Sequence, residues 1–339
     1  MVYREAAGPS ENIWRITEGE LLEARRVVDA HALRTPLVPV PSIDPRVWLK
    51  LETRQHTGSF KVRGALAKLA SLARAERSGP IVTASAGNHG HGVAFAAGKL
   101  GMEVKVFVPK NTPRVKLEGM RSRGAEVVVT EEAGYDATEA LAREEVEREG
   151  GVFVSPYDDS TVAAGNGGTV GQELFGLPAG AEGLGSTLGM GEVGALVVPV
   201  GGGGLVCGLA AARDHVGSGA KLVGINCEAS PGMARSFAEG RTITELPHAE
   251  TLAEGLEGGV SPSTYTNAMA AGVEMHTVGE DAIAEAMRFA KHTLGERVEG
   301  SAAVGLAWVR ANLGEIPGTA PVVVILTGAN VDDARWDAL

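Results

Sequence analysis

The chain alternates short apolar runs with longer segments in which apolar residues recur at helical spacing. The short runs predict strands at residues 47–52, 81–83, 104–108, 126–129, 152–154, 195–199, 222–226 and 322–326. Helical spacing predicts helices at residues 90–100, 135–149, 206–212, 281–292 and 301–312, and another that starts at Pro113. Strands alternating with helices favour right-handed crossovers and mainly parallel sheets. The predicted fold class is α/β, with two doubly wound domains.

The predicted elements divide into a small lobe inside a larger one. We expect a small domain at residues 79–156 and a large domain made of residues 1–78 and 157–339. Near the start, Thr17 and Glu20 have capping-box spacing, which predicts a helix that ends before Pro36. Residues 176–194 contain seven glycines and no periodicity, which favours a mobile surface loop, either a lid or, preferably, a tolerated insertion.

Composition narrows the range of partners. The 339 residues are 44% hydrophobic and carry a net charge of -11 without a basic run, which argues against nucleic acid and anionic membranes and favours a small-molecule substrate. No apolar stretch is long enough to span a bilayer, so we expect a cytoplasmic protein, with a homodimer or higher homo-oligomer as the default assembly. Cys207 and Cys227 are interpreted as buried thiols.

A first candidate for chemistry is Lys61, which follows Phe60 and precedes an apolar, helix-like run. A lysine that forms a covalent bond to a carbonyl must be held near neutrality, which requires partial desolvation and a fixed position. Phe60 and the small residues nearby can supply both. Taken alone, the stretch fits a solvated first-turn lysine at least as well.

A second candidate is the tetraglycine loop, Gly201, Gly202, Gly203 and Gly204, which runs from a strand into a helix that includes Leu205. Glycines at such a place let backbone N–H groups turn toward one anion at the helix N-terminus, which predicts a phosphate cradle. The loop lacks the spacing of nucleotide and dinucleotide motifs, so the phosphate should be small and singly attached. A purely structural glycine turn is the less favoured alternative.

Two further stretches follow predicted strands. The loop Ser85-Ala86-Gly87-Asn88-His89 precedes a helix and can present free N–H groups to a substrate carboxylate, although Asn88 can equally be a helix cap. His89 and His91 are interpreted as ordinary loop histidines, because no metal-ligand companion stands nearby. At the end of the last strand Thr327 offers a neutral hydroxyl, and Glu299 is either a site carboxylate or a first-turn glutamate.

The order of these stretches resembles the fold-type II pyridoxal-phosphate enzymes related in fold to tryptophan synthase β, specifically the threonine dehydratase and serine racemase group, from about residue 16 to 332. The resemblance implies that Lys61 attaches pyridoxal 5'-phosphate and that Phe60 packs on its ring. It also implies that Asn88 bonds its phenolic oxygen, that Gly201 to Gly204 with Leu205 hold its phosphate, and that Thr327 faces its pyridine nitrogen. The implied substrate contacts are Ser85, Ala86, Gly87, Asn88 and His89.

The resemblance implies β-elimination from a β-hydroxy amino acid, L-threonine or L-serine, to a 2-oxo acid and ammonia. A racemase, a β-replacement synthase and a non-catalytic cofactor-binding protein are the alternatives. In racemases of this group a serine stands at the position of Ala86, and an alanine can neither give nor take a proton. We therefore expect poor racemisation.

Several features depart from the family pattern. Residues 164–169 are one residue longer than the usual motif and place Asn166 where a glutamine is usual. The positions that match a divalent-metal site are Asn226, Ser230 and Gly232, which predicts no metal there, even with Glu228 close by. The chain ends soon after Thr327, so we expect no C-terminal regulatory domain and no inhibition by isoleucine.

Overall fold

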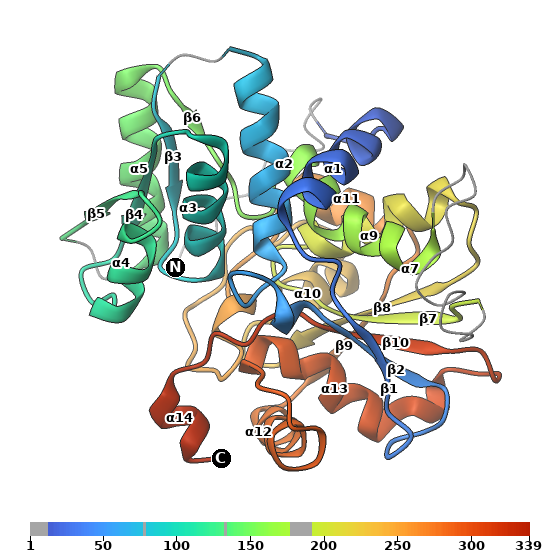
Figure 1. Cartoon of the computed structure of the whole chain (residues 1–339). Helices are drawn as coiled ribbons and strands as arrows, with labels where there is room; N and C mark the ends of the chain where they lie inside the picture. Colours follow the sequence, from blue (N-terminus) through green and yellow to red (C-terminus); the bar gives the residue numbers. More distant parts are fainter. Residues whose placement is uncertain (1–12, 77–78, 132–133, 177–191) are drawn as a thin grey trace.

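The computed structural model describes residues 13–76, 79–131, 134–176 and 192–339 (Figure 1). Most of the glycine-rich segment at residues 176–194 lies outside this part of the chain, so the prediction of a surface loop there has no counterpart in the structure. Among the described residues, no helix has the length and apolar character needed to cross a bilayer.

The larger sheet has six strands in the order β1-β2-β10-β7-β8-β9 (Figure 1). Their bounds are β1 Leu37–Pro39, β2 Val47–Leu51, β7 Ala195–Pro199, β8 Lys221–Cys227, β9 Glu274–Val278 and β10 Val322–Leu326. All neighbours pair in parallel except β1 and β2. The central strands β7 and β10 are buried along their whole length, as near-continuous apolar runs require in a sheet covered on both faces.

The smaller sheet has four parallel strands in the order β5-β4-β3-β6. Their bounds are β3 Ile81–Ala84, β4 Val104–Val108, β5 Glu126–Val129 and β6 Val152–Phe153. The α/β class with mostly parallel sheets is therefore confirmed, and every predicted strand is present to within one residue at each end. The proposed domain bounds at residues 79 and 156 stay a prediction.

The helices lie against both sheets (Figure 1). Their bounds are α1 Glu18–His31, α2 Lys61–Arg74, α3 Asn88–Leu100, α4 Arg114–Arg121, α5 Tyr135–Glu149, α6 Ser160–Ala163, α7 Thr169–Phe175, α9 Gly204–His215, α10 Gly232–Glu239, α11 Pro262–Ala270, α12 Glu280–Phe289, α13 Gly300–Asn312 and α14 Asp333–Asp337. The predicted capping box at the start of α1 is confirmed, because the Thr17 side chain accepts from the Glu20 N–H and the Glu20 side chain accepts from the Thr17 N–H. The helix ends before Pro36, as expected.

Residues Ala164–Gly168 form a π-helical turn between α6 and α7. A π-turn holds one more residue than an α-turn, so it accommodates the extra residue that the sequence shows here. This turn packs directly on α9. A side-chain carbon on Gly167 would overlap the Leu205 carbonyl oxygen, and one on Gly208 would overlap the Ala163 carbonyl oxygen. The two backbones therefore touch, at a separation that only glycine permits.

A buried ionic cluster joins β2, α2 and α7. It consists of Lys50, Glu52, Arg63 and Glu173, each at most 1% exposed. Arg63 donates to Glu52 from Nε (2.8 Å) and Nη2 (2.9 Å), and to Glu173 from Nη1 (2.7 Å). Its two remaining N–H groups reach the Thr169 hydroxyl and the Leu33 carbonyl oxygen. All five donors of this guanidinium are thus satisfied, and Lys50 pairs with Glu173 to balance the charge.

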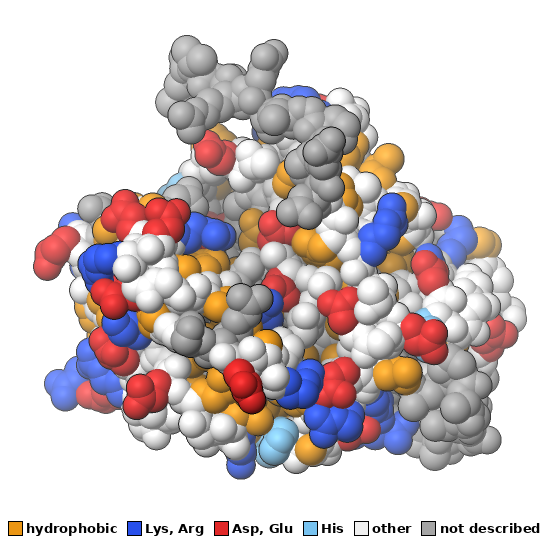
Figure 2. Space-filling model, turned by 90° about the horizontal axis from the view of Figure 1, so that it is seen from above, with side chains coloured by type: hydrophobic (Ala, Val, Ile, Leu, Met, Phe, Trp, Pro, Cys, Tyr) orange, Lys and Arg blue, Asp and Glu red, His pale blue; other side chains and the backbone are white. Residues whose placement is uncertain are grey.

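The surface carries charges of both signs. Figure 2 shows Lys and Arg side chains interspersed with Asp and Glu on the face that it presents. Many of these groups form exposed ion pairs within one helix, such as Arg114 with Glu118 on α4. Such pairs contribute little to stability.

Candidate active site

Lys61 is the first residue of α2, and the loop before it is fixed by the end of β10. The Phe60 N–H donates to the Thr327 carbonyl oxygen (3.1 Å), and Ser59 forms an isolated bridge with Gly328. The carboxyl ends of central parallel strands are where ligands bind in open α/β sheets. The fold therefore places Lys61 at such an edge.

The Lys61 amine lies in a poorly solvated position. Its Nζ donates to the Pro156 carbonyl oxygen (2.9 Å) and lies 5.2 Å from the centroid of the Phe60 ring. Burial lowers the pKa of Lys61 to about 8, although the charge of Glu299 acts in the opposite direction. A substantial fraction of the amine is therefore neutral near pH 8, as a nucleophile or a general base requires.

The tetraglycine loop leads from β7 into α9. Gly203 is the N-cap of α9, has a φ of +93°, and supplies no side-chain cap to the first-turn N–H groups. A side-chain carbon on Gly202 would overlap the Tyr157 ring, and one on Gly203 would lie 2.7 Å from the Met233 methyl carbon. Glycines shaped in this way, at the uncapped N-terminus of a helix, fit a ligand with one phosphate group.

Residues 156 and 157 connect the lysine with this loop. Pro156 accepts the hydrogen bond from Lys61, and a side-chain carbon on Gly204 would lie 3.0 Å from Tyr157 Cα. The predicted loop residue Leu205 is buried in the same apolar cluster as Phe60. The structure thus brings together the predicted attachment lysine and the predicted phosphate cradle, which are about 140 residues apart in the sequence.

Thr327 ends its strand beside this group and is 4% exposed. Its carbonyl oxygen accepts from Phe60, whereas its hydroxyl makes no hydrogen bond with any residue that the structure describes. The hydroxyl is therefore available to a ligand. That it faces a pyridine nitrogen stays a prediction.

Asn88 begins α3, so its interpretation as a helix cap is wrong, because Gly87 is the N-cap. Its Nδ2 donates to Glu299 Oε1 (2.8 Å), and its Oδ1 accepts from Asn330 Nδ2 (2.6 Å). Burial raises the pKa of Glu299 to about 7, and the hydrogen bond from Asn88 partly opposes that shift. Asn88 and Glu299, both candidates from the sequence, therefore meet side by side.

The loop before α3 is open on one side. Ser85 Oγ accepts from the Gly87 N–H (3.2 Å), and a side-chain carbon placed on Gly87 would meet no atom within 4 Å. Ala86 is partly buried and packs against the apolar core of the small sheet. The first-turn N–H groups of α3 lie next to this open space, where a carboxylate can bind.

His89 and His91 belong to helix α3, so their interpretation as ordinary loop histidines is wrong. His89 is 3% exposed, its Nε2 lies 3.1 Å from the Val154 carbonyl oxygen, and its buried Nδ1 has no partner in the described part of the chain. Burial and then the charge of Lys61 lower the pKa of His89 to about 3. The imidazole is therefore neutral, with Nε2 donating and Nδ1 left as an acceptor.

The positions compared with a divalent-metal site make other contacts. Asn226 donates to the Val200 carbonyl oxygen and accepts from the Ala234 N–H, and Ser230 Oγ accepts from the Gly258 N–H. No group of three or more His, Cys, Asp or Glu side chains with metal-binding geometry occurs within residues 13–76, 79–131, 134–176 and 192–339. The absence of a divalent-metal site stays a prediction.

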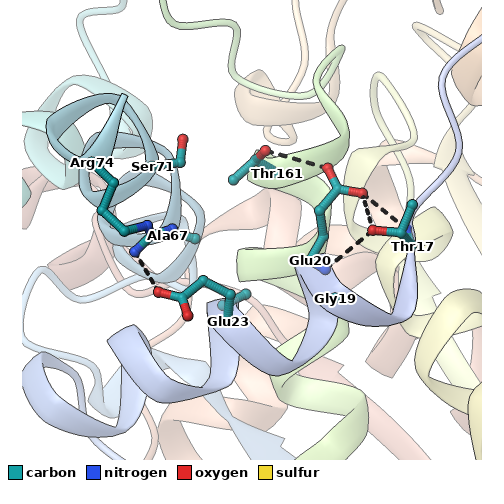
Figure 3. Close-up of a pocket in the computed structure, with 9 residues that line it drawn as sticks. Thr17, Gly19, Glu20, Glu23, Ala67, Ser71, Arg74 and Thr161 are labelled. Atoms are coloured by element: carbon teal, nitrogen blue, oxygen red, sulfur yellow. Dashed lines mark hydrogen bonds and ion pairs between the residues drawn. The ribbon is translucent and has the colours of Figure 1, made fainter. Parts of the chain in front are cut away.

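A cavity of about 300 Å³ lies elsewhere, between α1 and α2 (Figure 3). Its charged lining groups are engaged with one another. Glu23 pairs with Arg74, and Glu20 accepts from Thr17 and lies 3.4 Å from the Thr161 hydroxyl. None of the predicted site residues lines it, so the cavity does not change the choice of Lys61 as the candidate centre.

The sequence analysis missed three contributors to the candidate site. Pro156 acts through its backbone, so no side-chain pattern marks it. Tyr157 is an isolated aromatic residue at a strand end. Asn330 was part of a recognised stretch without a role, and its place after the last buried strand is the signal that could have identified it.

Comparisons with known proteins agree with the expected family. Residues 28–328 match the family model described as pyridoxal-phosphate dependent enzyme. The L-threonine ammonia-lyase of Thermotoga maritima is 35% identical over 324 residues, which cover 94% of this chain and 76% of that protein. The structure of maize serine racemase has a TM-score of 0.84 at 27% identity and covers 96% of this chain and 97% of its own. The crystal structure of the T.th. threonine deaminase has a TM-score of 0.82 at 32% identity, with 93% and 99% covered.

Proposed function

Because the chain belongs to the family of pyridoxal-phosphate dependent enzymes, we propose that it converts L-threonine or L-serine into a 2-oxo acid and ammonia by β-elimination of the hydroxyl group. Relatives that carry the names L-threonine ammonia-lyase and threonine deaminase support this activity. The observation that carries the proposal is the environment of Lys61, whose amine has a pKa of about 8 and is held at Pro156 beside the tetraglycine loop.

We propose the following contacts for pyridoxal phosphate. Lys61 attaches it covalently, Phe60 packs on its ring, and Asn88 donates to its phenolic oxygen. The N–H groups of residues 201–205 hold its phosphate, because they lie at the uncapped start of α9. Thr327 offers its hydroxyl to the ring nitrogen. When bound, the cofactor supplies an electron sink for the negative charge that develops at the substrate Cα.

The chain's own residues account for the remaining steps. The start of α3, at Ser85 to His89, binds the substrate carboxylate through its free N–H groups. The released Lys61 amine accepts the proton from Cα, after which the bond from Cβ to the hydroxyl oxygen breaks and that oxygen leaves as water. A second water later replaces the amino group, which leaves as ammonia, so the atoms balance.

Thr327 favours elimination over transamination. A carboxylate at this place would stabilise a proton on the ring nitrogen, whereas a neutral hydroxyl does not. The negative charge at Cα is then less strongly delocalised, and expulsion of the hydroxyl is favoured over slower reprotonation elsewhere.

The decisive experiment incubates the purified protein with a panel of β-hydroxy amino acids and assays ammonia, 2-oxo acid and the D-isomer together. We expect equal amounts of ammonia and 2-oxo acid from L-threonine or L-serine. The same incubations with added sulfide or a thiol expose a β-replacement synthase by its substituted product. Absence of both 2-oxo acid and substituted product from a cofactor-loaded protein would contradict the proposal.

Replacing Ala86 with serine should introduce racemisation. The wild-type site has Lys61 on one face of the planar carbon and a methyl group at the position where racemases of this group have a hydroxyl, so a proton removed from Cα is not returned on the opposite face. We expect D-serine formation well below pyruvate formation in the wild type, and a clear increase in the ratio of D-serine to pyruvate in Ala86→Ser.

The matched control is Ala86→Val, which adds bulk without a hydroxyl and should leave D-serine at the wild-type level. Chiral chromatography of the products measures the ratio for all three proteins. D-serine formation by the wild type that equals its pyruvate formation would contradict the assignment and favour the racemase alternative.

We also propose a cytoplasmic homo-oligomer. The acidic net charge and the small-molecule substrate support a soluble setting, and a symmetric dimer is the commonest assembly of such enzymes. Light scattering on the purified protein tests the assembly, and cell fractionation tests the location.

A further inference from the structure

Three side chains form a hydrogen-bonded row between the end of β10 and the start of α3. Asn330 Nδ2 donates to Asn88 Oδ1 (2.6 Å), and Asn88 Nδ2 donates to Glu299 Oε1 (2.8 Å). Asn330 Nδ2 also donates to the Thr57 carbonyl oxygen (2.8 Å), in the loop that leads to Lys61. The row therefore connects the lysine loop, the last strand of the large sheet and the first helix of the small sheet.

The chemistry of the row permits only one orientation of each amide. A backbone carbonyl can only accept, so the Thr57 oxygen requires the NH₂ end of Asn330 on its side. That NH₂ group in turn requires the oxygen end of Asn88. The NH₂ end of Asn88 then faces Glu299, whose carboxylate accepts. Rotating the Asn88 amide by half a turn would oppose two donors at one end and two acceptors at the other.

Glu299 is well placed to hold its end of the row. It is the N-cap residue of α13, and its backbone N–H donates to the Gly328 carbonyl oxygen (3.0 Å). The Asn330 backbone N–H also donates to its carboxylate. Of the two hydrogens on Asn88 Nδ2, the described residues accept one, so the second remains available to a ligand.

We propose that Asn330 and Glu299 are positioning residues that orient the Asn88 amide so that its second N–H, and not its oxygen, faces the phenolic oxygen of the cofactor. This inference rests on the proposed function, because the contact between Asn88 and the cofactor is part of it. The phenolic oxygen accepts hydrogen bonds, so an Asn88 amide turned the other way would repel it. The orientation of a single amide is thus set by residues more than 200 positions away in the sequence.

The test compares Asn330→Ala, Glu299→Ala and Glu299→Gln in the cofactor-loaded enzyme. The readouts are the visible absorbance spectrum, which reports on the phenolic oxygen, and kcat and KM for L-threonine. We expect both alanine variants to shift the spectrum and to lower kcat roughly tenfold with little change in KM, as a misoriented catalytic group does. Glu299→Gln should retain the wild-type spectrum, because the Gln side-chain oxygen can still accept from Asn88.

Asn88→Ala supplies the background that separates positioning from a direct or structural role. In that background, adding Asn330→Ala should shift the spectrum no further, because the amide that Asn330 orients is gone. The matched control is Asn312→Ala at the far end of α13, where Asn312 donates only to Trp308 of its own helix. It should leave the spectrum unchanged.

Each outcome has a distinct meaning. A wild-type spectrum in Asn330→Ala and Glu299→Ala, or a further shift on adding Asn330→Ala to Asn88→Ala, would overturn the inference. If Asn330→Ala fails to fold for loss of the Thr57 contact, the two Glu299 variants decide alone: an equal shift in both overturns the positioning role. A wild type that binds no pyridoxal phosphate indicates instead that the proposed function has failed.

Discussion

Replacing Lys61 with methionine should lower the rate of 2-oxo acid formation by roughly a thousandfold or more, because the residue serves both as the attachment point and as the base. Methionine fills similar space without an amine. We expect the variant protein to fold, to bind pyridoxal phosphate without a covalent link, and to show no adduct on the peptide that contains residue 61 after borohydride reduction and mass spectrometry.

The same change should stabilise the cofactor-free protein. The pKa of Lys61 falls from 10.5 to about 8 on folding because the ammonium is desolvated. Such a shift corresponds to roughly 3 kcal/mol, reduced to about 2 kcal/mol because the side chain is partly exposed. Between these two pKa values the folded protein binds fewer protons than the unfolded chain, so stability rises with pH across that window and the full penalty applies below pH 8.

At pH 7, urea unfolding should therefore show Lys61→Met to be more stable than the wild type, by an amount that shrinks as the pH approaches 10.5. Lys68→Ala is the matched control. Lys68 lies two turns further along α2 and pairs with Asp159, so its removal should reduce stability slightly and leave the activity intact. Activity of Lys61→Met near the wild-type level would exclude Lys61 as the catalytic residue.

Replacing Glu173 with alanine should destabilise the protein by about 3 to 5 kcal/mol, because it leaves two buried cations facing one anion. Burial raises the pKa of Glu173, but Arg63 and Lys50 outweigh it and hold the pKa below its ordinary value. The carboxylate is thus charged in the folded protein. Without it, Lys50 and one end of the Arg63 guanidinium lose their acceptors in a place that water does not reach.

Removing a matching charge should restore most of that loss. In Lys50→Met with Glu173→Gln, the Gln side-chain oxygen can still accept from Arg63 and one cation balances one anion. Urea denaturation midpoints should place this double variant within about 1 to 2 kcal/mol of the wild type, since neutral replacement of buried ion pairs is often tolerated.

The exposed pair of Arg114 and Glu118 provides the comparison, because Glu118→Ala should cost no more than about 0.5 kcal/mol. A loss of that small size in Glu173→Ala would contradict the expected role of the buried cluster. Since Arg63 lies two residues after Lys61, we also expect Glu173→Ala to reduce cofactor binding.

Much of the fold follows from local patterns in the sequence. Strands β7 and β10 are continuous β-branched runs bounded by glycine or proline, and such runs identify a buried parallel strand without reference to the rest of the chain. The lysine stretch and the tetraglycine loop are also continuous, so their chemistry and order indicated the family.

The elements that sequence reasoning missed depend on distant partners. Strand β9 is a half-exposed edge strand with polar residues, and only its pairing with β8 makes it a strand. The ionic cluster joins Glu173 to Arg63, and neither neighbourhood predicts the other. His89 was assigned to a loop because the small residues before it hide where α3 begins. Contacts between such distant positions follow from tertiary packing and not from local preference.

The glycine contact between the π-turn and α9 makes cofactor affinity depend on a site that touches no cofactor. Gly208 lies one helical turn after Gly204, so its backbone contact with Ala163 sets how far α9 stands from its neighbour and hence where the helix N-terminus lies. A single methyl group at Gly167 or Gly208 would push the helix aside as a rigid rod and carry the anion-binding end with it. Damage there would resemble a vitamin-responsive defect, in which a folded enzyme regains activity when its cofactor is supplied in excess.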